Sequence, residues 1–127
     1  MENNPLMGQF VSTLFASRTQ AHIFHLQTTG EGSFATHSAL NSYYDEIVGL
    51  TDGLVESYQG KYGIIKGYTN FGLMEYTNKQ QLIQYFEALD STIQTLCSDI
   101  SDSYIQNQID TITELVQSTL YKLKFLN

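Results

Sequence analysis

Residues 59–78 read QGKYGIIKGYTNFGLMEYTN, and this stretch decides how the rest of the chain is arranged. Four glycines alternate here with aromatic residues, a pattern typical of a connection that packs on the body of a protein through its aromatic side chains. On both sides of it, apolar residues recur at the three- and four-residue spacing of amphipathic helices. The sequence therefore predicts two helices before this stretch, two after it, and a long crossover at 59–77 that could itself hold a short helix.

The predicted helices begin and end at recognisable signals. Asn4 and Pro5 suit an N-cap and a first-turn proline, Ser33 suits a second N-cap, and Thr77 or Asn78 suits a third. The Ser-Asp-Ser run at 101–103 interrupts the apolar pattern, and we expect it to cap the last helix. The four helices are predicted at about residues 5–28, 33–58, 78–100 and 103–125.

Each predicted helix carries one apolar stripe, which we expect to form the core. The stripes are Phe10, Val11, Leu14, Ala21 and His25; then Leu40, Tyr43, Tyr44, Ile47, Leu50, Leu54 and Tyr58; then Leu82, Phe86, Leu89, Ile93, Leu96 and Ile100; and finally Ile105, Ile109, Ile112, Val116, Leu123 and Leu126. Four such helices in 127 residues indicate a single all-α domain over residues 1–127. A long crossover between helices two and three favours a ferritin-like four-helix bundle over an up-down-up-down one, which needs only short loops.

The bulk composition excludes several classes of function. The net charge is −7, from 6 Lys and Arg against 13 Asp and Glu, so direct DNA binding is not expected, whereas attraction of cations is. No run approaches the roughly 18 apolar residues of a membrane span, and the N-terminus has no secretory signal, so we expect a cytoplasmic protein without membrane contact. The single cysteine, Cys97, has apolar neighbours and is expected to be buried and chemically silent.

The second helix carries a polar face that is separate from its core stripe. At about 100° per residue, His37, Asn41, Asp45, Asp52 and Glu56 fall within roughly 100° of one another. A polar helix face is usually only solvated, but this one has no cation and has valines at its edge. From the residues alone, a solvated face and a metal-binding face that meets another subunit both remain open.

Two further histidines, His22 and His25, lie near the end of the first helix. His25 falls on the apolar stripe, where a core role and a ligand role are both open. Imidazole and carboxylate ligands together suit Fe(II), Mn(II) or Zn(II). No Glu-x-x-His occurs in the sequence, so a di-iron centre inside one bundle is disfavoured and a site between subunits is preferred.

Three short stretches, HIFHLQTTG (22–30), FATHSALNSYYDE (34–46) and TDGLVE (51–56), together resemble the Dps mini-ferritins. That family has a His closing the first helix, a Gly-containing turn, a second His opening the second helix, and an Asp-x-x-x-Glu further along. The matching residues are His25, then His37 at 12 residues on, Asp52 at 15 more and Glu56 at four more. Within this superfamily the chain looks closest to small uncharacterised ferritin-like proteins of tailed phages.

The resemblance implies that His25 and His37 of one subunit, with Asp52 and Glu56 of its two-fold mate, bind iron and oxidise Fe(II) with peroxide or oxygen, for storage or detoxification. It implies a homo-oligomer, at minimum a two-fold dimer and in the family a dodecamer, in the cytoplasm or, for a phage protein, that of the host. Zinc or manganese could take the same site, and Asn41, Asp45 and His22 are further candidate ligands. The alternative is a ferritin-like structural or partner-binding module without ferroxidase activity, which Asn41 and Leu26 favour because the family often has an acidic residue and a Trp there.

Overall fold

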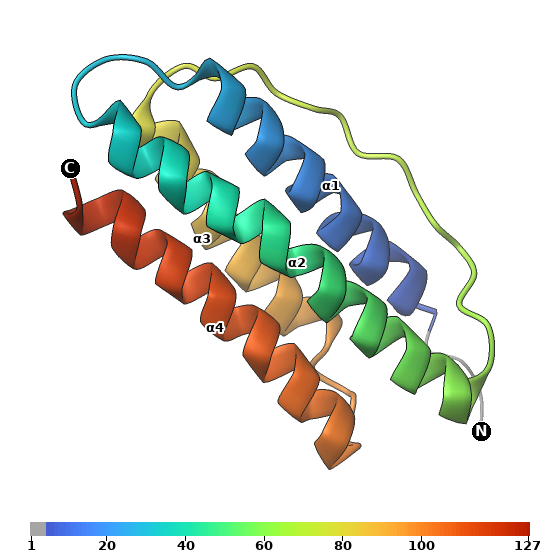
Figure 1. The fold of residues 1–127 in the computed structure, drawn as a ribbon. Coiled ribbons are helices and arrows are strands. Elements are labelled where there is room, and N and C mark those ends of the chain that lie inside the picture. The colour runs from blue at the N-terminus through green and yellow to red at the C-terminus, as the bar shows by residue number, and fades with distance from the viewer. Residues whose placement is uncertain (1–4) are drawn as a thin grey trace.

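The computed structural model describes residues 5–127, which form four helices and, within that range, no strand (Figure 1). The predicted all-α four-helix bundle is confirmed. An extended crossover at residues 63–78, without any helix, joins the second helix to the third and runs along the outside of the first (Figure 1). The helices are α1 (Met7–Gln27), α2 (Ser33–Tyr62), α3 (Lys79–Leu96) and α4 (Ser103–Phe125).

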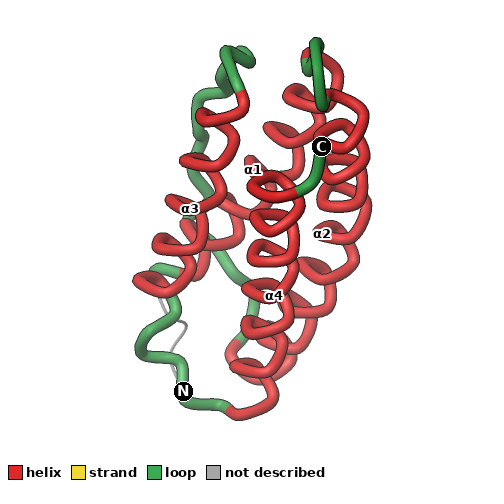
Figure 2. Tube along the Cα trace, turned by 90° about the vertical axis from the view of Figure 1, so that its left-hand side faces the viewer, coloured by secondary structure: helices red, strands yellow, loops and turns green. Residues whose placement is uncertain are grey.

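The crossover fixes the direction of the helices. It carries the chain back to the end of the bundle where α2 began, so α2 and α3 point the same way, while α1 and α4 point the opposite way (Figure 1). Contacts run from α1 to α2, from α2 to α4, from α4 to α3 and from α3 back to α1, so the four helices close into a ring (Figure 2). The core is the space inside this ring.

The predicted apolar stripes supply most of this core. Nearly all of their residues are buried, including His25 and Ile100, and Cys97 is buried as predicted. Tyr44 and Leu50 are only partly buried. The prediction for Leu126 is wrong, because α4 ends at Phe125 and the side chain of Leu126 is 41% exposed.

The helix ends follow the sequence signals in part. Asn78 is the N-cap of α3 and its side-chain oxygen accepts a hydrogen bond from the backbone N–H of Gln81 at 2.9 Å, as a cap should. At the start of α2 the cap position is Gly32, with a φ of 76° that favours glycine, and Ser33 is instead the first helical residue. The predicted cap Asn4 lies outside the described residues, and Pro5 precedes α1 in a turn.

Asp102 occupies the N-cap position of α4 but does not cap that helix with its side chain. Its carboxylate accepts hydrogen bonds from the Lys61 ammonium and the Tyr62 hydroxyl at the end of α2. These contacts accompany the four-residue extension of α2 beyond the predicted end, to the point where Gly63 adopts a φ of 95°. At the other connection, α3 ends at Leu96, four residues before its predicted end, although Ile100 still reaches the core.

The crossover is attached to α1 mainly through side-chain amides. The Gln20 amide donates to the carbonyl of Met74 at 2.8 Å and accepts from the N–H of Met74 at 2.7 Å. The N–H of Tyr76 donates to the Gln27 side chain at 2.8 Å, and the N–H of Thr69 to the Ser12 hydroxyl at 2.9 Å. Of the aromatic residues expected to anchor this segment, Tyr62 and Tyr76 are partly buried, whereas Tyr68, stacked on Phe15, and Phe71 are a little under half exposed.

Candidate functional site

The turn between α1 and α2 brings His25 and His37 together. Gly30 and Gly32 adopt φ angles of 95° and 76°, which lets five residues reverse the chain between the two helices. The two imidazole rings then stack, with centroids 3.6 Å apart and planes 25° from parallel. His25 is buried and His37 is exposed, so the pair extends from the core to the surface.

The two histidines hold each other through reciprocal hydrogen bonds. The Nδ1 of His25 lies 2.8 Å from the carbonyl oxygen of His37, and the Nδ1 of His37 lies 3.1 Å from the carbonyl oxygen of His25. A carbonyl oxygen only accepts, so each Nδ1 carries the hydrogen and donates it. In the neutral rings both Nε2 atoms therefore keep their lone pairs, and a backbone carbonyl that fixes the tautomer in this way is the usual support behind a metal-binding histidine.

Two more side chains extend this pair into an aromatic cluster. The ring of His22 stacks on that of Tyr44 at 4.4 Å, and the Tyr44 ring meets His25 edge-on at 5.3 Å. The Tyr44 hydroxyl donates to Asn41 Oδ1 at 2.6 Å, and Asn41 Nδ2 donates to Asp45 Oδ2 at 3.2 Å. Both polar atoms of the Asn41 side chain are thus engaged within the chain.

Tyr44 is the member of this cluster that the sequence interpretation missed. Its position on the apolar stripe predicts core packing, whereas the ring is only partly buried and lies between two histidines. The available signal is its spacing, because Tyr44 follows His37 by seven residues, two helical turns, and so shares its side of α2.

Asp52 and Glu56 do not join the histidines within one chain. Both are exposed on α2, and 15 residues of helix separate His37 from Asp52, which is about 22 Å at 1.5 Å per residue. Within residues 5–127, no group of three or more His, Cys, Asp or Glu side chains is placed to hold a metal ion. One copy therefore supplies two imidazoles at one position and two carboxylates at another.

The outward face of α2 between these positions is apolar and anionic. Val48 is exposed near its middle, Gly49 has open space where a side chain would be, and Phe34 is 71% exposed one turn before His37. The one Lys of α2, Lys61, is paired with Asp102 at the far end. This face thus differs from an ordinary solvated helix surface, on which lysines and glutamates of mixed sign alternate.

Cys97 takes no part in these clusters. It lies after α3 and is buried, and burial raises the pKa of its thiol to about 12, with a smaller contribution from the nearby Asp99 carboxylate. A thiol with so high a pKa carries almost no thiolate near neutral pH and is a poor ligand and nucleophile.

Comparison with known proteins identifies a family for most of the chain. A family described as a family of unknown function (DUF5856) matches residues 25–123, a range that begins at His25 and includes His37, Asp52 and Glu56. No curated protein and no solved structure matches the chain. No helix in the described part of the chain has the length and apolarity needed to cross a membrane.

Proposed function

Because the chain belongs to the DUF5856 family, whose function is unknown, we propose its function from its own side chains. The protein is a ferritin-like iron-binding protein whose site is shared between two copies. His25 and His37 come from one copy, and Asp52 and Glu56 come from the other. Fe(II) is the substrate, and oxidation to Fe(III) serves storage or detoxification.

One observation carries this proposal, namely the reciprocal bonding of the histidine pair. Both Nδ1 atoms are used by backbone carbonyls, so His25 and His37 each have one nitrogen left to bind a cation. The chain holds this arrangement with a turn in which Gly30 and Gly32 both have positive φ angles. A pair held so firmly supplies two ligands with little loss of side-chain entropy on binding.

A second copy can complete the site because of where the carboxylates lie on α2. Two α2 helices packed antiparallel about a two-fold axis near Asp45 and Glu46 place His37 of one copy opposite positions 52–56 of the other. Val48 and Gly49 then lie close to the axis, where an apolar residue and a missing side chain allow close approach. The contact would also cover the exposed Phe34.

The chemistry of this shared site suits Fe(II). Imidazoles bind the ion as borderline ligands, and the carboxylates of Asp52 and Glu56 lower the cost of reaching Fe(III) because they stabilise the higher charge. Two Fe(II) ions supply the two electrons that reduce one hydrogen peroxide, with two protons, to water. The net charge of −7 favours arrival of cations at the surface.

A second candidate function is a helical structural or partner-binding module with the same fold and no oxidation activity. Asn41 favours it, because both of its polar side-chain atoms are bonded to Tyr44 and Asp45 and an amide is a poor ligand for a hard cation. In this second function, Asn41 and Asp45 hold the Tyr44 side chain and the surface of α2 in place, and the protein binds at most one ion.

Anaerobic titration with Fe(II), followed by peroxide, separates the two functions. We expect saturable Fe(II) binding and fast oxidation in the wild type. Loss of an outer-shell partner typically weakens metal binding by about 10- to 100-fold, so His37→Ala and Glu56→Gln, which each remove a proposed ligand, should weaken Fe(II) binding by at least about tenfold. Asp110→Asn, an exposed carboxylate on α4, is the matched control and should behave as wild type. If all four proteins bind Fe(II) equally weakly and oxidise it equally slowly, the result contradicts the iron function and favours the structural or partner-binding module.

A further inference from the structure

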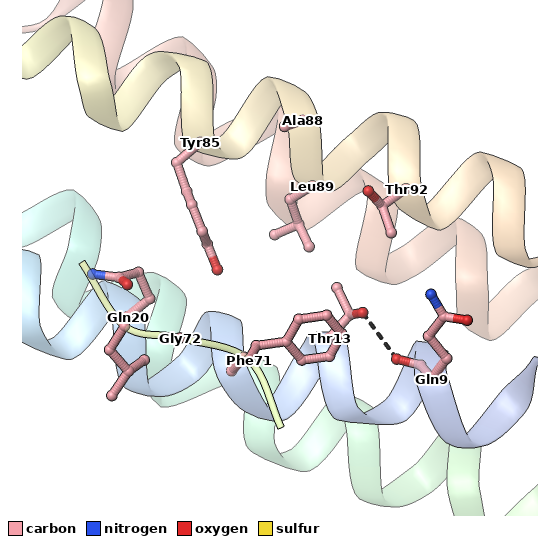
Figure 3. Close-up of a pocket in the computed structure, with 11 residues that line it drawn as sticks. Gln9, Thr13, Gln20, Phe71, Gly72, Tyr85, Ala88, Leu89 and Thr92 are labelled. Carbon is pink, nitrogen blue, oxygen red and sulfur yellow. Dashed lines mark hydrogen bonds between the residues drawn. The ribbon is translucent and has the colours of Figure 1, made fainter. Parts of the chain in front are cut away.

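A cavity of about 320 Å³ lies between α1, α3 and the crossover, whereas the histidine pair lies where α1 ends and α2 begins. α1 and α3 make the least contact of the four neighbouring helix pairs, and the crossover only partly covers the space between them. Figure 3 shows Tyr85 reaching into this space from α3, with Phe71 of the crossover and Thr13 of α1 opposite it. The volume is at the lower end of the range that small-molecule sites occupy.

The walls of this cavity carry no charge. None of the 11 lining residues is Asp, Glu, Lys, Arg or His, although the chain as a whole has a net charge of −7. Leu89, Ala88 and Ala16 form apolar surface, and the rings of Phe71 and Tyr85 provide two aromatic walls. A charged molecule would lose hydration here without gaining a counter-charge, so the site favours a neutral, apolar one.

Besides Gln20, the polar side chains that line the cavity are those of Gln9, Thr13, Thr92 and Tyr85, and Tyr85 is the one whose ring also forms part of the apolar wall. The amide of Gln20, which also lines the cavity, is bonded through both its nitrogen and its oxygen to the backbone of Met74. The Tyr85 hydroxyl points into the space, as Figure 3 shows, and makes no hydrogen bond within residues 5–127. Burial raises the pKa of Tyr85, so the hydroxyl remains a proton donor at every ordinary pH.

We propose that this cavity binds a small uncharged aromatic molecule that carries a hydrogen-bond acceptor. The ring lies against Phe71 and Leu89, and the acceptor receives the hydrogen of the Tyr85 hydroxyl. This site is independent of the iron proposal, because it shares no residue with the histidine pair or with the outward face of α2.

Titration with benzamide, followed by NMR of the aromatic side chains, tests the site. We expect saturable shifts of the Phe71 and Tyr85 ring signals with benzamide. Benzoate, its anionic counterpart of similar shape, should bind more weakly by about tenfold or more, because its carboxylate loses hydration without gaining a counter-charge. In Tyr85→Phe, benzamide should bind about five- to tenfold more weakly, whereas toluene, which has no acceptor, should bind both proteins equally.

A second pair of variants fixes the location. Ala88→Phe places a ring over the cavity and should abolish the benzamide shifts, whereas Ser91→Phe, on an exposed part of the same helix outside the cavity, should leave them intact. Equal binding of benzamide and benzoate, no saturable shift, or the same loss in both phenylalanine variants would overturn the proposal. If Ala88→Phe does not fold, the benzamide and toluene comparison in Tyr85→Phe decides the question alone.

Discussion

Gly8 shows what a single position on α1 contributes to the crossover. A Cβ atom there would lie 2.3 Å from the carbonyl oxygen of Lys66 and 2.7 Å from the carbonyl carbon of Gly67, and backbone atoms cannot move aside as a flexible side chain can. The next turn of α1 presents Ser12, whose hydroxyl donates to the Gly8 carbonyl and accepts from the N–H of Thr69. The close approach of the two backbones therefore depends on a missing side chain.

We predict that Gly8→Ala lowers the free energy of unfolding by about 1–3 kcal/mol, because the crossover must shift to admit the methyl group. Gly60→Ala is the matched control. Gly60 lies within α2 with open space around it, so alanine should raise stability by roughly 0.5–1 kcal/mol through its better helix propensity. Urea denaturation of both variants measures this difference, and equal effects of the two substitutions would contradict the close contact.

Single residues also show what sequence could and could not reveal of the site. The resemblance to the Dps mini-ferritins implied that His25 and His37 of one copy act together, and the structure stacks the two rings across a short turn between antiparallel helices, which has few geometries. The reciprocal bonds to each other's carbonyls were not predictable, since they depend on backbone positions to within an ångström. The role of the buried Gln20, which binds the backbone of Met74, was not predictable either, because it depends on where the crossover lies.

At the scale of elements, hydrogen bonds from Lys61 and Tyr62 to Asp102 join the end of α2 to the start of α4. The hydrogen bond from Lys61, and then that from Tyr62, lowers the pKa of the Asp102 carboxyl below its ordinary 3.8, and the pKa of Lys61 is raised, first by the same hydrogen bond. A carboxyl with a depressed pKa stabilises the fold above the unfolded-state pKa and loses that contribution as the pH falls through the folded-state value.

We predict that Asp102→Asn is less stable than wild type by a constant amount between about pH 5 and pH 9, and that the difference disappears as the pH falls below 3.8, where wild-type Asp102 gains its proton. Thermal unfolding of the two proteins across pH 2–9, in about 0.1 M salt, gives the comparison. Asp110→Asn, at an exposed position of α4, should show no such pH-dependent difference. A stability difference between wild type and Asp102→Asn that stays constant down to pH 2 would show that the negative charge of Asp102 does not stabilise the fold.

Elements were also the scale at which sequence was most informative. Helical periodicity located all four helices because it reports which side of each one faces the core, and the last was correct to the residue. The ends of α2 and α3 were misjudged because local signals compete with distant partners there. The neighbouring sequence predicts that Asp102 caps α4 with its side chain. Its carboxylate instead accepts a hydrogen bond from the hydroxyl of Tyr62, 40 residues away in the sequence.

At the scale of the whole molecule, the proposed pairing of two copies predicts that two defective variants can restore an Fe(II) site together that neither can form alone. His37→Ala and the double variant Asp52→Asn, Glu56→Gln should each bind Fe(II) poorly as pure proteins. Mixed after unfolding and refolding together, they form heterodimers in which one site combines intact histidines with intact carboxylates. About a quarter of all sites should then recover, since half of the dimers are mixed and half of their sites are whole.

Iron titration of the refolded mixture measures the recovery, with light scattering to establish its molar mass. Refolding each variant separately is the control and should restore nothing. Absence of recovery, in a preparation shown to contain mixed dimers, would place all of the ligands in one chain or none of them in a common site. A protein that is monomeric at every concentration would contradict the pairing itself.

The crossover divides the molecule into two helical hairpins. α1 with α2 and α3 with α4 each form from neighbouring sequence, and the crossover at 63–78 joins the two hairpins into one chain. A chain break between Asn70 and Phe71, which are both exposed, would sever the crossover without touching a helix, and the two fragments would remain bound through the core they share. In its architecture the protein is thus a covalently linked pair of hairpins, and separately expressed halves are a natural route to reassembling it from parts.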